Sequence, residues 1–190
     1  MKRILNIYLS VFQRLIALIN YPDETWHKID MENSRKELFR HFFYPLLLLG
    51  AVLFFITKIA VFHDFSIITA IFETIFMIVS FLCAFVICKK IYQTTTKHIY
   101  KIELSDIQLD KIIVYALSVI LAVKIIAKIL DFQFINFFWL YSIFVFWKVC
   151  DVILKLQDDG KRRELFLVIN TLSVICIPLI IEYILILFIR

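Results

Sequence analysis

The feature that most constrains the fold of this chain is a series of long apolar segments that contain almost no glycine or proline. Of its 190 residues 62 % are hydrophobic, whereas soluble domains carry roughly 45–50 % apolar residues even with glycine counted. Glycine occurs twice and proline three times. Sheets and nucleotide-binding loops depend on turns made by these residues, so helices are what remains. We therefore expect an all-α polytopic membrane protein.

Five segments are long and apolar enough to cross a bilayer, which takes about 20 residues per helix. They cover residues 42–62, 65–88, 108–130, 134–154 and 165–189. Capping-box patterns at Ser34 and Ser105 predict where the first and third helices begin. Pro45 is expected to kink the first helix near the inner surface. The prediction is a five-helix transmembrane bundle over residues 34–190.

The region 1–33 is expected to lie at the membrane surface rather than to cross it. Residues 3–19 place apolar side chains at helical spacing with polar ones opposite, a pattern typical of an amphipathic helix in the interface. Pro22 suits the first turn of a second short helix. Trp26 is expected at headgroup depth. Phe12 and Trp26 are therefore candidate lipid-contacting residues.

The distribution of lysine and arginine predicts the orientation of the chain. Residues 1–41 carry seven of them, 89–111 carry five and 155–164 carry four, against Arg190 alone on the opposite side. Positive residues are retained on the cytoplasmic side, so we expect a cytoplasmic N-terminus and an external C-terminus. Membrane lipids are the expected partners, with other membrane proteins as a second class. Nucleic acid is not needed to explain the charge.

A basic surface is expected at the inner ends of the helices, formed by Lys89, Lys90, Lys161, Arg162 and Arg163. The last three are candidate lipid-contacting residues, because anionic headgroups attract such clusters. The alternative is a plain stop-transfer signal, with no specific recognition. Nearby, Lys148 and Asp151 share one helical face and are expected to pair within their helix.

Two short motifs and their order along the chain resemble a known family. Residues 21–29 read Tyr-Pro-Asp-Glu-Thr-Trp-His-Lys-Ile, and residues 44–47 open the first span with Tyr-Pro-Leu-Leu. In this layout the chain resembles the bacterial branch of the Yip family, the Ypt/Rab-GTPase-interacting membrane proteins. The resemblance implies a five-span fold, a cytoplasmic N-terminus and the bacterial inner membrane. Eukaryotic members carry an Asp-Leu-Tyr-Gly-Pro-like signature that is not found in this sequence. A Rab partner is therefore not carried over from the family.

Three ionisable residues, Glu73, Lys124 and Glu182, fall inside predicted spans, each roughly 10 Å beneath the outer surface at ~1.5 Å per residue. Lys58 and Lys128 lie shallower on the same side. A charge at the centre of a membrane helix costs about 2.5–3.5 kcal/mol, so such residues are read as paired or functional. In one interpretation Glu73 or Glu182 pairs with Lys124. The two shallower lysines then snorkel to the interface.

In the other interpretation these five residues line a polar cavity that binds an ion or a lipid headgroup or relays protons. Enzyme motifs are not found: the four histidines lie in separate segments, and no G-x-S-x-G, P-loop or G-x-G-x-x-G sequence occurs. No catalytic residue, metal ligand or cofactor is predicted. The predicted function is a non-catalytic Yip-type scaffold or organiser that engages lipids or partner proteins. The alternative is a small transporter or channel component.

Overall fold

The computed structural model describes residues 2–31, 34–61, 66–130, 138, 141–152, 154 and 160–188. Within these ranges the regular structure is helical, which confirms the all-α prediction. In chain order the helices are α1 (Lys2–Asn20), α2 (Pro22–Met31), α3 (Arg35–Leu38), η1 (Phe39–Phe43), α4 (Tyr44–Val61), α5 (Ile67–Thr95), η2 (Thr96–Tyr100), α6 (Asp106–Ile129), α7 (Tyr141–Val152) and α8 (Gly160–Leu187).

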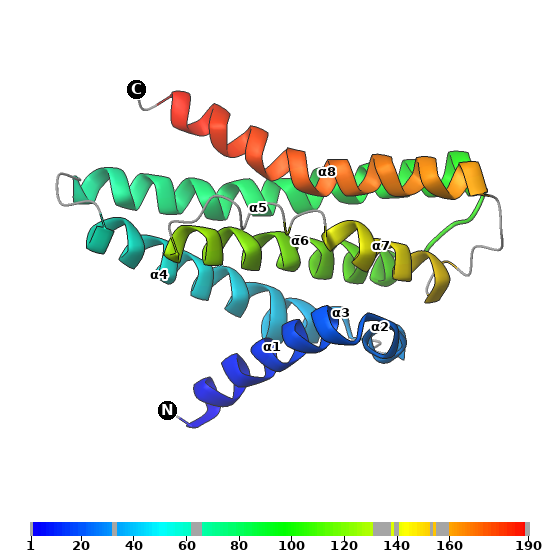
Figure 1. The fold of residues 1–190 in the computed structure, drawn as a ribbon, viewed down its shortest axis with the longest axis horizontal. Coiled ribbons are helices and arrows are strands. Elements are labelled where there is room, and N and C mark those ends of the chain that lie inside the picture. The colour runs from blue at the N-terminus through cyan, green and yellow to red at the C-terminus, as the bar shows by residue number, and fades with distance from the viewer. Residues whose placement is uncertain are drawn as a thin grey trace.

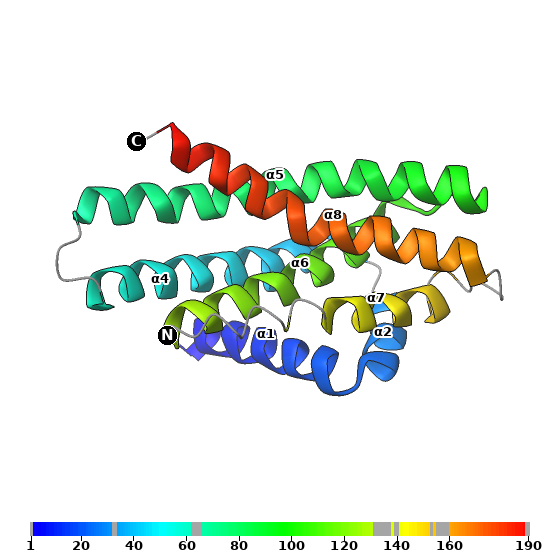
Figure 2. The same ribbon diagram turned by 45° about the horizontal axis from the view of Figure 1, so that its top comes forward.

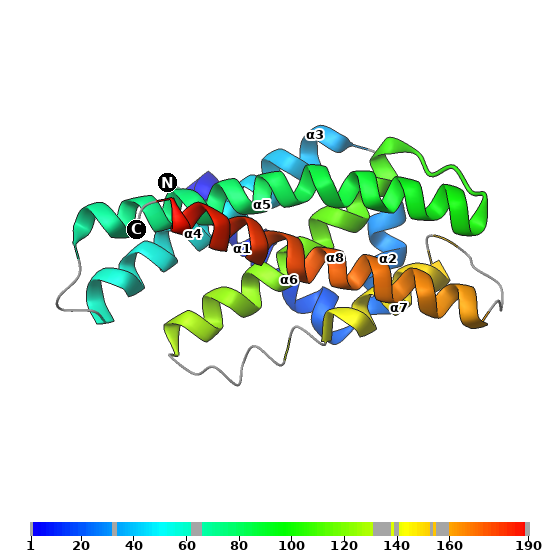
Figure 3. The ribbon, with the colours of Figure 1, turned by 90° about the horizontal axis from the view of Figure 1, so that it is seen from above.

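Four helices in the described part of the chain are long and apolar enough to cross a membrane. They cover Arg35–Ile59, Ile67–Tyr100, Asp106–Ile129 and Gly160–Leu187. They lie side by side along the longest axis of the molecule, with α4, α6 and α8 running in one direction and α5 in the other (Figures 1 and 3). These helices support the assignment to the class of membrane proteins, because little else accommodates so many long apolar helices.

The predicted span 134–154 corresponds to no helix of that length among the described residues. α7 has 12 residues, about 18 Å at ~1.5 Å per residue, whereas the hydrocarbon core is about 30 Å thick. Most of the remaining residues of that span lie outside the described ranges. α6 and α8 nevertheless run in the same direction (Figure 1), so Ile129 at the end of α6 and Gly160 at the start of α8 lie toward opposite ends of the bundle.

α6 is the central helix of the bundle. Its residues from Leu109 to Leu121 are all buried, on every side of the helix. It packs against α4, α5, α7 and α8. On the α4 side the contact is close at Gly50, where an added Cβ would come within 2.9 Å of a methyl group of Ile125. Small residues let membrane helices approach in this way.

The two N-terminal helices pack on the bundle, α1 beside α4 and α2 beside α7 (Figure 2). Val11, Leu15 and Leu18 of α1 are buried. An adjacent stripe of α1 is exposed, formed by Leu5, Leu9, Phe12, Ile16 and Ile19. The predicted apolar face of this helix is thus divided between the protein and its surroundings.

The helix that begins at Arg35 changes its hydrogen-bonding pattern just before Pro45. η1 is a π-helical turn, in which the Tyr44 N–H donates to the carbonyl of Phe39. Proline lacks an N–H, and its ring clashes with the carbonyl four residues earlier, here that of His41. The sequence located this distortion correctly, and the structure accommodates it by widening one turn.

The polar residues after Cys88 continue α5, although the predicted span ended there. Helix runs without interruption from Ile67 to Tyr100, 34 residues or about 50 Å. The hydroxyls of the threonines at 94–96 donate to carbonyls of the preceding turn, which makes this polar stretch compatible with a helix. The helix ends at Lys101, whose φ of 57° is left-handed.

Candidate functional site

The four long helices each contribute one charge to a group that we call the paired layer: Lys58 (α4), Glu73 (α5), Lys124 (α6) and Glu182 (α8). Lys124 pairs with Glu182, and Lys58 pairs with Glu73. Their side chains are between 12 % and 18 % exposed. Of the two partners considered for Lys124, the structure therefore selects Glu182. Lys58, which was predicted to snorkel to the interface, has Glu73 as a partner.

An aromatic ring connects the two ion pairs of the paired layer. The ammonium groups of Lys58 and Lys124 lie 5.8 and 5.9 Å from the centroid of the Phe54 ring. Lys124 also lies 6.0 Å from the ring of Phe81. Ring faces attract cations, and the attraction grows where water is excluded. Lys128, one turn beyond Lys124, is partly buried and makes a contact of its own.

A second group of charges, the Asp110 network, lies near the start of α6. Asp110 is fully buried; its carboxylate accepts a hydrogen bond from Lys89 Nζ at 2.7 Å and lies 2.6 Å from Arg35 Nε. Lys89 also reaches Asp106, at 3.0 Å. The network joins α3, α5 and α6. Lys89 therefore belongs to it, rather than to a free basic surface.

Sequence reasoning missed Asp110 as a site residue. It lies close to a helix start, where acidic residues are common because the helix dipole favours negative charge. The available signal was its position: Asp110 lies one turn after Asp106, the first residue of the helix, and beyond Lys111 the sequence carries no further charge up to Lys124. An acidic residue at that point faces the bundle, where it needs a cation.

The charged residues of α7 bind other helices, so the predicted pair within α7 is wrong. Lys148 Nζ lies 2.8 Å from Asp23 of α2, and Asp151 accepts a hydrogen bond from Arg163 of α8 at 2.7 Å. The Arg163 guanidinium also lies over the Trp147 ring, 4.3 Å from its centroid. The Arg163 side chain is only 13 % exposed. It is held by protein, contrary to its prediction as a lipid-contacting residue.

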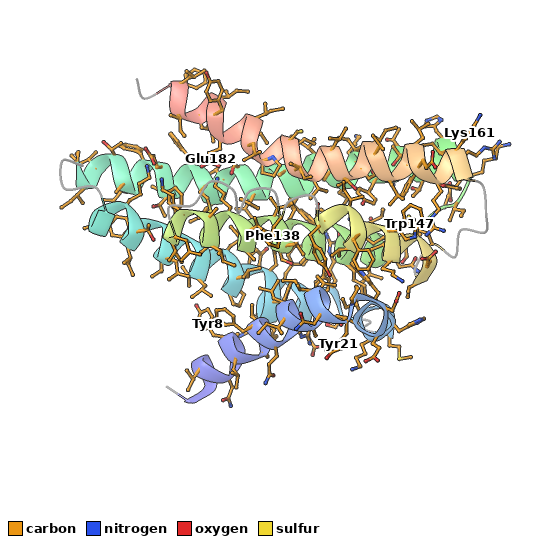
Figure 4. All side chains as sticks on the ribbon, viewed as in Figure 1. Tyr8, Tyr21, Phe138, Trp147, Lys161 and Glu182 are labelled. Atoms are coloured by element: carbon orange, nitrogen blue, oxygen red, sulfur yellow. The ribbon has the colours of Figure 1, made fainter. Side chains whose placement is uncertain are left out.

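Of the other lipid-contacting candidates one is buried and three are exposed. Trp26 is fully buried, with its ring edge-on against Tyr115 at 5.8 Å, so its prediction is also corrected. Its indole is covered because α2 folds onto the bundle. Phe12 is 47 % exposed. Lys161 and Arg162 are exposed at the start of α8, where Figure 4 shows Lys161 at one end of the molecule.

Comparisons with protein-family models, curated proteins and solved structures give no match for this chain. Among the described residues no group of three or more His, Cys, Asp or Glu side chains has the arrangement of a metal site. Chemically, the paired layer and the Asp110 network hold helices together. Each places opposite charges in contact where water is scarce, and each joins segments far apart in the sequence.

Proposed function

We propose that this protein is a non-catalytic integral membrane scaffold or organiser of Yip type. The observation that carries the proposal is the paired layer, in which the intramembrane charges contact one another across helices. A charge used for transport has to exchange its partner for an ion or a proton. Direct lysine–carboxylate pairs flanked by Phe54 favour a structural role for these residues.

We further propose five membrane crossings in a bacterial inner membrane, with a cytoplasmic N-terminus and an external C-terminus. α8 starts at the end of the molecule where Lys161 lies, and α4, α6 and α8 all run away from that end (Figures 1 and 4). The fourth crossing would use residues 134–154, which include α7. Retention of positive residues on the cytoplasmic side supports this orientation.

The exposed stripe of α1 is the proposed working surface of the scaffold. Leu5, Phe12 and Ile16 are 70 %, 47 % and 55 % exposed, although large apolar side chains gain about 1.5–3 kcal/mol each on full burial. A stripe of this kind suits lipid or an apolar helix of a partner protein. Lys161 and Arg162 would add attraction to anionic headgroups.

The scaffold and transporter functions differ in what neutral variants of the paired layer should do. The variants are Lys124→Gln, Glu182→Gln and the two combined, with folded yield in detergent and ion or proton flux in proteoliposomes as readouts. For a structural pair each single variant lowers the yield and the double variant restores most of it. A double variant that folds normally but abolishes a flux present in the native protein would establish the transporter.

The scaffold role is tested through α1. Phe12→Asp should remove the protein's proximity cross-links to partners in membranes while leaving its folded yield unchanged, because the side chain is exposed. Gln13→Asp, at the neighbouring exposed polar position, is the matched control. Unchanged cross-links in Phe12→Asp would contradict the proposal.

A further inference from the structure

A cavity of about 800 Å³ lies on the flank of the bundle, between the start of the first long helix and α5. Three cationic side chains line it, those of Arg35, Lys36 and Arg40. Its remaining wall is aromatic and aliphatic, formed by Phe39, Phe43, Tyr44, Leu82, Phe85 and Val86. A ligand that fits both parts of the lining has to carry negative charge and apolar groups.

Aromatic rings close this cavity on the side of the bundle interior. The Phe85 ring of α5 lies edge-on to Phe39, with centroids 5.2 Å apart, and 6.0 Å from Phe43. On the opposite side the wall is open, because Leu82 and Val86 are 39 % and 64 % exposed. A ligand therefore enters from the surroundings of the bundle and rests against a packed aromatic floor.

The two walls of the cavity differ in polarity. Lys36, Arg40 and Tyr44 follow one another at four-residue intervals on one wall. The α5 wall carries the alkyl side chains of Leu82 and Val86. A phospholipid offers a group to each wall: a phosphate to the cations and an acyl chain to the alkyl side chains. A soluble phosphate compound would leave the apolar part of the wall unused.

Two of the three cations that line the cavity have a charge that a ligand can bind. Arg35 pairs with Asp110. Lys36 and Arg40 have no ion-pair partner among the described residues, and both are exposed. Glu37, the nearest carboxylate in the sequence, lines a different cavity. The π turn at η1 places Arg40 beside the aromatic floor, and such turns recur at functional sites.

We propose that this cavity binds one anionic phospholipid of the cytoplasmic leaflet. The phosphate lies between Lys36 and Arg40, and an acyl chain lies along Leu82 and Val86. The inference rests on the membrane location and orientation proposed above and is independent of the scaffold role. The site is separate from the basic end of α8 that contains Lys161.

The first test is native mass spectrometry of the full chain in detergent, with phosphatidylglycerol or phosphatidylcholine added at equal concentration. One phosphatidylglycerol should be retained in preference to phosphatidylcholine. Lys36→Gln/Arg40→Gln should weaken its retention about 25-fold, since each cation near an anionic surface contributes about a factor of five. The control Lys28→Gln/Lys101→Gln removes two exposed charges elsewhere and should retain the lipid. Equal retention of both lipids, or no loss in the cavity variant, would overturn the proposal.

A second variant tests the cavity itself with all charges kept. Val86→Trp fills the open wall and should abolish retention of phosphatidylglycerol, whereas Val79→Trp, at an exposed position of α5 outside the cavity, should not. Displacement of the lipid by an equal concentration of inorganic phosphate would overturn a lipid as the occupant. These readouts do not involve flux or partner cross-linking, so failure of this site and failure of the scaffold proposal are distinguishable.

Discussion

The paired layer and the Asp110 network use the same interaction in two different arrangements. In the paired layer each cation contacts one carboxylate of the described residues, and all four side chains are 12–18 % exposed. In the Asp110 network two cations converge on one fully buried carboxylate, and these cations are 20 % and 58 % exposed. When one residue of an ion pair is replaced, its former partner stays in the protein as an unpaired ion. The loss of unfolding free energy therefore depends on how buried that ion is and on whether a second partner remains.

The largest expected effect is in the paired layer. Glu182→Leu leaves Lys124 without its carboxylate among apolar helices, so we expect the unfolding free energy to fall by about 3 kcal/mol. Unfolding in mixed detergent micelles measures it. Lys124→Met combined with Glu182→Leu should recover most of the loss, because no unpaired charge remains. A double variant as unstable as the single one would mean that packing, rather than charge, is lost.

A smaller effect is expected in the Asp110 network. Lys89→Met removes one of two cations from a buried carboxylate that keeps Arg35, so we expect a loss of about 1–2 kcal/mol in the same unfolding assay. Asp106→Asn, at the exposed edge of the network, is the matched control and should leave the midpoint unchanged. If Lys89→Met cost as much as Glu182→Leu, the proposed difference between the two arrangements would be wrong.

The independence of the two groups can be measured by combining their variants. Lys124 and Asp110 are 14 residues apart on α6, about 21 Å at ~1.5 Å per residue. Effects at sites this far apart usually add within about 0.5 kcal/mol. Glu182→Leu with Lys89→Met should therefore lose the sum of the two single effects. A deviation of more than 1 kcal/mol would show that α6 couples the groups.

The smallest effect sets the baseline of the comparison. Lys97 and Glu103 form an ion pair of 3.5 Å near the end of η2, with side chains 66 % and 81 % exposed. Exposed pairs contribute about 0–1 kcal/mol, so Lys97→Ala should change the unfolding free energy by less than about 0.5 kcal/mol. High salt should remove even that difference. A larger loss would indicate that this pair is shielded from water in the membrane.

Features that depend on neighbouring residues were predicted well. The capping box at Ser105 is present with both of its hydrogen bonds, and the Ser34 hydroxyl accepts the Glu37 N–H. The helix is irregular just before Pro45, as expected. Four of the five predicted hydrophobic segments lie in long helices of the described part of the chain, because in lipid every backbone polar group has to be satisfied within the segment.

Features that depend on the order and rotation of helices were predicted less well. The apolar faces of α1 and α2 could meet lipid or protein, and only the packed structure shows Trp26 covered by Tyr115. Polarity alone ended the second span at Cys88, whereas the helix continues to Tyr100. A polar segment outside a membrane can remain helical when its hydroxyls bond to its own backbone.

The sequence by itself determined that this chain is helical and suited to a membrane, since composition and the period of apolar residues act within single segments. It also singled out Glu73, Lys124 and Glu182 as residues that need partners. The tertiary structure decided which charges meet: Lys124 with Glu182, Lys58 with Glu73, and Asp110 with two cations. Ion pairing requires contact within a few ångströms, and that distance depends on how separate helices are placed and turned against one another.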